Sequence, residues 1–167
     1  MKFDIAPGNK NYEVLSQKII ITRSNRFEKK CDVIVFACRN LEKVVIPPHI
    51  KEIASYAFSG CQYLKTIEFS RDSKLTKIDD FAFAFSSIEN ILIPPSIKII
   101  GERSFFSCYK LKEVRFVKET KIELIKKEAF AETGLDEIAL PEDVVELEEG
   151  WCGSKTKETR IAPDYNY

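Results

Sequence analysis

The sequence lacks the features that mark membrane-inserted, nucleic-acid-binding or metal-binding proteins. No run approaches the ~20 apolar residues that a membrane helix needs, and no apolar run follows the amino-terminal lysine as in a signal peptide. The 26 basic and 26 acidic residues balance, which gives no electrostatic case for nucleic acid or an anionic membrane. There is no CxxC pair and no Asn-x-Ser/Thr site. These absences argue against direct membrane insertion, a nucleic-acid partner and a zinc site. They do not decide the compartment, because they fit both a cytoplasmic protein and a piece of a larger secreted chain.

What the sequence does contain is an internal repeat. Ile88–Cys108 reads IENILIPPSIKIIGERSFFSC, and the same pattern recurs over Leu41–Cys61. Taking the first apolar residue of each copy as a marker gives intervals of 23, 24, 23 and 24 residues. Copies without prolines alternate with proline-containing ones and carry a longer charged turn (SRDSK, VKETK). Aligning 41–87 on 88–134 gives 17 identities in 47 positions, so the larger unit is a doublet.

The spacing within a copy predicts its local structure. The L-x-x-I-x-I segment alternates as a strand with one buried face should. The prolines fall just after such strands, where a missing N–H does not interrupt a ladder. A second apolar pair, such as Ile97 and Ile100, is predicted to be extended, and the segment before each repeated phenylalanine suits a short helix or 3₁₀ turn. Identical short strands at a fixed period stack in parallel about 4.8 Å apart.

These spacings predict one solenoid domain. Residues 1–40 are expected to be an irregular strand and loop region that continues the solenoid, and residues 156–167 a partial repeat or tail. The segments Asp4–Pro7 and Arg160–Tyr165 resemble each other, so we expect the chain to start and stop in the same phase of a repeat, as in a longer array or one whose end is covered by another copy. The five repeats expected over 41–155 are 41–63, 64–87, 88–110, 111–134 and 135–155.

The cysteines are odd in number, which argues against a disulfide framework. Three of them fall at one point of the repeat, so we interpret them as small apolar thiols in a buried column, all free. Cys38 and Cys61 fall in neighbouring coils and could pair under oxidising conditions. The cysteines are Cys31, Cys38, Cys61, Cys108 and Cys152.

The pattern LxxIxIPxxIxxIGxxxFxxC resembles the BspA-like, or treponemal-type, class of leucine-rich repeats. Ile88–Cys108 matches it almost position for position, including Gly101, and the resemblance is strong over Leu41–Cys152. It implies a leucine-rich-repeat solenoid: a right-handed coil with a parallel sheet on its concave face and short extended segments and short helical or 3₁₀ turns on the other sides. It also implies adhesion to host matrix or cell-surface proteins, because BspA-like proteins are surface proteins of mouth and gut bacteria and of parasitic protists.

The sequence departs from this pattern in two columns. Other residues stand at the glycine position in four repeats, and we expect the cysteine column to be interrupted at Phe85 and Glu132. Both departures are expected to change loop geometry and packing, not the fold. The residues at the glycine position are Ala54, Asp79, Lys126 and Glu148.

No residue set indicates catalysis. The single histidine, His49, follows two prolines in a turn, and the nearest thiol in the pattern, Cys61, is expected in the core rather than beside it as a Cys–His pair requires. Carboxylates are plentiful but are expected on solvent-facing turns, where nothing perturbs their pKa. No glycine-rich phosphate loop occurs. We therefore predict no catalytic residue, no metal site, no cofactor and no enzyme activity.

The remaining candidate is the outward surface of the strands. The first column after the marker alternates in sign from coil to coil, which cross-strand pairing alone would favour, so one interpretation is ordinary solvated sheet. The other is a shallow mixed patch around Val45, Leu92 and Arg115 that binds a protein, although no aromatic anchor is expected on it. The candidate residues are Lys43, Val45, Thr66, Glu68, Asn90, Leu92, Glu113, Arg115, Glu137 and Ala139.

The leading hypothesis is a non-enzymatic protein-binding module of the surface or adhesion type. The alternative is an intracellular structural scaffold that self-associates end to end, and an enzyme of unknown reaction comes third. Oligomers that depend on concentration would favour the scaffold.

Overall fold

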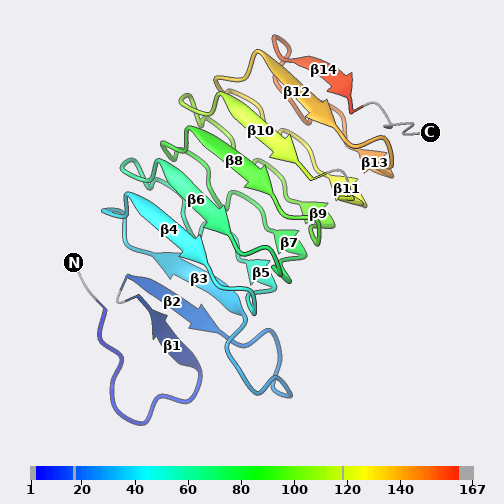
Figure 1. The fold of residues 1–167 in the computed structure, drawn as a ribbon. Coiled ribbons are helices and arrows are strands. Elements are labelled where there is room, and N and C mark those ends of the chain that lie inside the picture. The colour runs from blue at the N-terminus through cyan, green and yellow to red at the C-terminus, as the bar shows by residue number, and fades with distance from the viewer. Residues whose placement is uncertain (1–2, 17, 118, 162–167) are drawn as a thin grey trace.

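The computed structural model describes residues 3–16, 18–117 and 119–161, which form a stack of coils (Figure 1). In this part of the chain no helix is long and apolar enough to cross a membrane. The strands are β1 (Tyr12–Leu15), β2 (Ile19–Thr22), β3 (Val33–Ala37), β4 (Lys43–Ile46), β5 (Glu52–Ile53), β6 (Thr66–Phe69), β7 (Lys77–Ile78), β8 (Asn90–Ile93), β9 (Ile99–Ile100), β10 (Glu113–Phe116), β11 (Leu124–Ile125), β12 (Glu137–Leu140), β13 (Glu146–Leu147) and β14 (Lys157–Arg160).

Two sides of the coil are parallel sheets, as the spacing predicts. The four-residue strands β4, β6, β8 and β10 form one sheet, and β12 with β14 forms a separate parallel pair. The two-residue strands β5, β7, β9, β11 and β13 form the second sheet together with β3 (Figure 1). The region 1–40 contributes to this second sheet in two ways: β3 pairs with β5 in parallel and so continues the stack, while β1 and β2 add an antiparallel hairpin at its edge. Residues 162–167, including most of the carboxyl-terminal match to Asp4–Pro7, lie outside the described residues.

The core is a set of ladders that run along the stack. In each long strand two side chains point inward. The apolar pair of each short segment, such as Ile97 and Ile100, packs from the other side; it is fully buried in the first four repeats and half-buried in the last, at Val144 and Leu147. The repeated phenylalanines stack face to face between them. Phe58, Phe83, Phe105 and Phe130 are fully buried, with ring centroids 5.0, 5.3 and 5.0 Å apart along the series. Offset stacking of this kind adds about 0.5–1.5 kcal/mol per pair beyond area burial.

The third side of the coil consists of hydrogen-bonded turns, and the prediction of short helices or 3₁₀ turns there is wrong for the described residues. The Phe58 N–H donates to the Ala82 carbonyl of the next coil at 2.8 Å, whereas the Ala57 N–H donates within its own turn, to Ala54 at 3.1 Å. Alternate N–H groups thus point along the stack and within the coil. This requires left-handed residues such as Tyr56 (φ 63°). In a helix every one of these N–H groups would donate to a carbonyl of the same segment. The hydrogen bonds between coils use some of these donors and therefore exclude a helix.

The cysteine column also differs from the prediction in its details. Buried Ser86 and half-buried Thr133 take the place of Cys61 and Cys108, three residues after the phenylalanine in each coil. The Ser86 hydroxyl lies 3.4 Å from the Cys108 sulfur, and the Thr133 hydroxyl donates to the Phe130 carbonyl at 3.0 Å. The coils without prolines lack one residue after this position, not before it. The column is therefore interrupted at Ser86 and Thr133, and the predicted Phe85 and Glu132 lie one residue earlier, in left-handed turn positions.

Candidate protein-binding groove

The outward side chains of β4, β6, β8, β10 and β12 make one surface, here called the long-strand face. In β8 and β10 burial alternates strictly, with outward residues exposed and inward residues buried. None of the ten predicted binding residues is buried. Exposed are Lys43, Val45, Glu68, Asn90, Leu92, Glu113, Arg115 and Glu137, and half-buried are Thr66 and Ala139.

The sheet under this face divides at the boundaries between doublets. The ladders β4–β6, β8–β10 and β12–β14 each join four residue pairs. Between β6 and β8 the ladder holds one pair, Thr66 with Asn90, and among the described residues no ladder joins β10 to β12. The 47-residue doublet of the sequence therefore appears in the structure as a tightly paired set of two strands. β6 and β8 separate beyond their single pair, toward the carboxyl ends of the two strands.

The prolines explain why the sheet opens there. The Lys112 N–H donates to the Glu89 carbonyl at 2.9 Å, so Glu89 faces β10. Because successive peptide groups of a strand alternate between its two edges, Leu92 and Pro94 face β6 instead. Pro94 has no N–H to donate, so the ladder toward the preceding doublet cannot continue past β8. Pro141 follows β12 in the same way.

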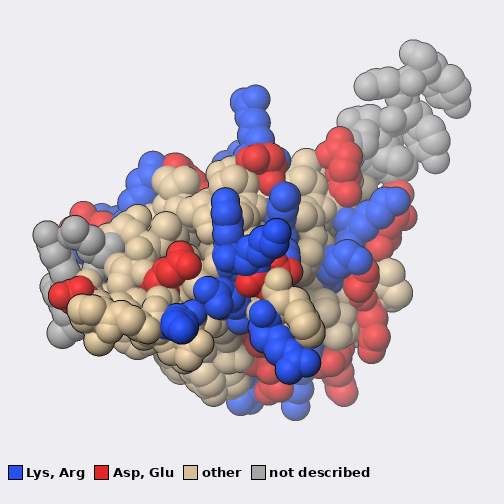
Figure 2. All heavy atoms as spheres, turned by 90° about the horizontal axis from the view of Figure 1, so that it is seen from below, with Lys and Arg blue, Asp and Glu red and all other residues tan. Residues whose placement is uncertain are grey.

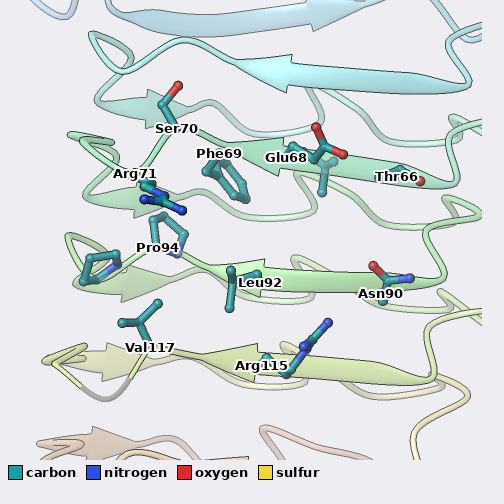
Figure 3. Close-up of a pocket in the computed structure, with 12 residues that line it drawn as sticks. Thr66, Glu68, Phe69, Ser70, Arg71, Asn90, Leu92, Pro94, Arg115 and Val117 are labelled. Atoms are coloured by element: carbon teal, nitrogen blue, oxygen red, sulfur yellow. The ribbon is translucent and has the colours of Figure 1, made fainter.

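A groove of about 380 Å³ lies where β6 and β8 separate (Figure 3). Its apolar lining includes Phe69, Leu92, Pro94 and Val117. Phe69 occupies an inward position of β6, but with the neighbouring strand displaced it is half-buried and lines the groove. The expectation that no aromatic residue stands on this surface is therefore wrong. Figure 3 shows Phe69, Pro94 and Leu92 close around the opening, with Arg71 beside them and Arg115 on the next strand.

The charges around the groove leave it locally positive. Lys43 Nζ lies 2.6 Å from Glu68 Oε1 in an exposed ion pair, so a basic side chain offsets the acidic side chain of the lining. Arg115 Nε lies 3.3 Å from Glu113 Oε1 on the same strand, and both side chains are exposed, so this pair is weak. Arg71, at the end of β6, makes no ion pair with any described residue. Two guanidinium groups thus flank an apolar opening.

Half of the predicted binding residues line this groove. Thr66, Glu68, Asn90, Leu92 and Arg115 belong to it, and the other five lie on neighbouring strands of the same face. The sequence pattern missed the lining residues that come from an inward position or a turn. The available signal was the longer charged turn SRDSK, which carries Arg71, together with the prolines at the doublet boundary. The missed residues are Ile67, Phe69, Ser70, Arg71, Pro94, Pro95 and Val117.

Carboxylates on the turns are joined to structural partners. Asp79 pairs with Lys77 at 3.1 Å, and Asp80 with Lys126 at 3.1 Å. The pKa of Asp79 lies below its usual value: burial alone would raise it, but the Asp80 N–H and the Lys77 ammonium outweigh burial. His49 is half-exposed in its turn, and the described residues hold no group of three His, Cys, Asp or Glu side chains suited to a metal ion. No disulfide joins cysteines of the described residues.

Comparison with known proteins identifies the repeat. The family model described as a BspA type leucine rich repeat region matches residues 29–153 in six copies. The chain belongs to this BspA-type leucine-rich repeat family. Repeats of this family are in general non-catalytic and imply protein binding in a broad sense. No curated protein matches the chain in sequence.

Solved structures of bacterial proteins share the BspA-type fold. The pneumococcal vaccine antigen PcpA is 28% identical, with a TM-score of 0.72 over 93% of this chain, which spans 40% of the PcpA chain. Leucine-rich repeat proteins from Eubacterium ventriosum and Bacteroides capillosus are 17% and 15% identical, with TM-scores of 0.60 and 0.56. They match 99% and 92% of this chain and 55% and 100% of their own. These last two show the fold alone.

Proposed function

We propose that this BspA-type chain is a non-enzymatic binding module whose groove between β6 and β8 holds a segment of a partner protein. The observation that carries the proposal is the opening of the long-strand sheet beyond the Thr66–Asn90 pair. It turns an otherwise regular sheet surface into a concave site with an aromatic residue in its lining. Concave apolar sites with a few convergent polar groups are the usual form of a binding site.

The lining indicates the chemistry of the partner segment. Phe69, Leu92 and Pro94 offer an apolar surface that fits one aliphatic or aromatic side chain. Arg71 and Arg115 flank that position, and guanidinium groups bind carboxylates in a bidentate manner. An extended segment with an apolar residue flanked by Asp or Glu therefore fits best. The groove is small, so a single module binds weakly, and repetition of modules raises the overall affinity.

The biological setting that fits such a module is contact with other cells or host proteins. The family assignment and the 28% identity to the antigen PcpA support a surface or adhesion role over other roles for a protein-binding repeat. On this proposal no cofactor is needed, because the site only has to present shape and charge. The alternative, a scaffold that associates end to end, predicts oligomers whose formation does not depend on the groove.

A peptide display library selected on the whole chain tests the proposal. Selection is expected to enrich an apolar residue flanked by Asp or Glu, and binding of the enriched peptides is expected to fall at least tenfold in Leu92→Asp. Val45→Asp is the matched control, because Val45 (53% exposed) and Leu92 (52%) hold equivalent positions on the long-strand face, but only Leu92 lines the groove. Arg71→Glu is expected to remove the preference for acidic residues while retaining the apolar one.

Two outcomes would contradict the binding site. Equal loss of binding in Leu92→Asp and Val45→Asp would place recognition on the whole face and not in the groove. Enrichment of basic peptides would contradict the assigned chemistry. Concentration-dependent oligomers in light scattering, with the same distribution in wild type and Leu92→Asp and no enriched peptide, would support the scaffold alternative instead.

A further inference from the structure

The loop between β2 and β3 carries a concentration of exposed basic side chains. Residues 23–30 read RSNRFEKK, with four basic residues and one acidic residue. Figure 2 looks onto this end of the molecule from below. Lys and Arg side chains gather near the centre of that view. The loop lies toward the amino-terminal end of the stack, on the opposite side of β4 from the groove (Figure 1). The basic side chains are those of Arg23, Arg26, Lys29 and Lys30, all exposed.

The acidic groups of this region are occupied by contacts that hold the loop in place. Buried Asp32 accepts hydrogen bonds from the Ser24 N–H at 2.7 Å and the Ser24 hydroxyl at 2.9 Å. Lys51 Nζ lies 2.7 Å from Glu28 Oε1 and 3.1 Å from Asp32 Oδ2. Both carboxylates therefore share the Lys51 ammonium, and buried Asp32 is held in addition by Ser24. The four exposed basic side chains make no ion pair with any described residue.

An aromatic side chain stands at the tip of this loop. Phe27 is 79% exposed, and its N–H donates to Asn25 Oδ1 at 2.9 Å, which closes the turn beneath it. The Arg26 guanidinium lies 4.8 Å from the centre of the ring. The tip is thus an apolar ring surrounded by unpaired positive charge. Binding to a soluble polyanion would use the charges alone and would leave the ring in water.

We propose that the loop 23–30 binds the surface of an anionic lipid membrane, with Phe27 at the depth of the headgroups and its basic neighbours on the lipid charges. The observation that favours lipid is the combination of an exposed ring and basic side chains on an anchored turn, because an interfacial segment buries apolar groups at the headgroup boundary while its Lys and Arg side chains attract anionic lipid. The balanced net charge of the whole chain does not oppose this, since exposed charges act over about a Debye length, ~8 Å at physiological salt. The loop rests on different residues from the groove, so the two proposals stand independently.

Vesicle co-sedimentation with the whole chain tests the proposal. Wild type is expected to bind vesicles of phosphatidylserine and phosphatidylcholine in equal parts, and not vesicles of phosphatidylcholine alone. Phe27→Ser is expected to weaken binding several-fold at unchanged net charge, with Tyr63→Ser as its control, because Tyr63 is also an exposed aromatic residue but lies elsewhere.

Arg26→Glu with Lys29→Glu is expected to weaken binding about 25-fold or more, at roughly fivefold per basic side chain lost. The double variant Lys74→Glu with Lys110→Glu makes the same change in net charge at exposed positions outside the loop, and is expected to bind like wild type.

The outcomes separate lipid from other anionic partners. Equal weakening in the two charge-reversal doubles would overturn the proposal, because binding would then follow net charge only. Unchanged binding in Phe27→Ser would overturn the role of the ring. Retention on heparin beads without binding to vesicles would overturn the lipid assignment. It would indicate that the loop binds a soluble polyanion. Thermal melting followed by circular dichroism shows whether each variant is folded, and the groove variant Leu92→Asp is expected to bind vesicles like wild type.

Discussion

Ser104 places a hydroxyl group in a column that otherwise holds alanine. Ala57, Ala82 and Ala129 occupy the equivalent buried positions beside the phenylalanine stack. Ser104 is fully buried and its oxygen has no hydrogen-bond partner among the described residues. A buried unsatisfied hydroxyl costs about 1–3 kcal/mol. Ser104→Ala is therefore expected to raise the free energy of unfolding in urea by about 1 kcal/mol or more.

A second serine provides the control for this prediction. The Ser86 hydroxyl is also buried, but it lies 3.4 Å from the Cys108 sulfur. Ser86→Ala removes this partner from the thiol and is expected to lower the free energy of unfolding. If both substitutions lowered stability equally, Ser104 would have to have a partner in solution.

Gly101 shows why the glycine position of the repeat is filled so differently from coil to coil. A Cβ at Gly101 would lie 2.5 Å from the Asp79 carbonyl carbon and 2.6 Å from the Asp80 nitrogen. Asp80 is close because its carboxylate passes over this coil, accepting the Glu102 N–H at 2.8 Å and contacting Lys126 two coils away. Glycine is thus required here mainly by the Asp79–Asp80 peptide group of a neighbouring coil, with Asp80 Oδ1 a further 2.8 Å contact. A repeat pattern does not contain this contact between coils.

The doublet boundary is the element-scale feature that distinguishes this solenoid from a uniform stack. Leu92 and Phe69 have N–H groups that face the opening between β6 and β8, whereas the N–H groups of Ile91 and Ile93 face β10 and lie in a four-pair ladder. Amides without a ladder partner open to solvent more readily. We expect the Leu92 and Phe69 amides to exchange with deuterium at least tenfold faster than those of Ile91 and Ile93, as measured by NMR. Equal protection of all four would show that the sheet closes over the groove in solution.

The sequence predicts the two parallel sheets, the buried ladders and the outward columns, because each follows from a spacing repeated in every coil. It does not predict the groove, because the groove depends on which edge of β8 the Pro94 nitrogen faces. Phe69 belongs to an inward position by pattern and becomes accessible only because the next strand is displaced. Helical turns are absent from the described residues for a related reason. Residues such as Tyr56 adopt left-handed φ and donate hydrogen bonds between coils, and the helix propensity of a single coil does not account for those bonds.

At the scale of the whole molecule, the loop 23–30 is joined to the stack through a buried carboxylate. Asp32 is 3% exposed. Burial alone would raise its pKa, but the hydrogen bonds from Ser24 and the Lys51 ammonium outweigh burial, so the pKa lies below its usual value. A carboxyl whose pKa is lowered by folding contributes stability above its unfolded pKa of about 3.9, and this contribution is lost as the pH falls through the folded value.

This coupling gives a prediction for acid denaturation. Asp32→Asn keeps the shape but not the charge, and is expected to lower the free energy of unfolding at pH 7 by about 1.5–3 kcal/mol, because hydrogen bonds to a charged group are lost. The difference from wild type is expected to shrink as the pH is lowered below about 4, where the wild-type carboxyl also takes up its proton. Urea denaturation at a series of pH values measures it. Asp72→Asn, at an exposed turn position, is the control and is expected to follow wild type throughout. A difference between Asp32→Asn and wild type that stays constant down to pH 2 would mean that shape, and not the charge of Asp32, ties the loop to the stack.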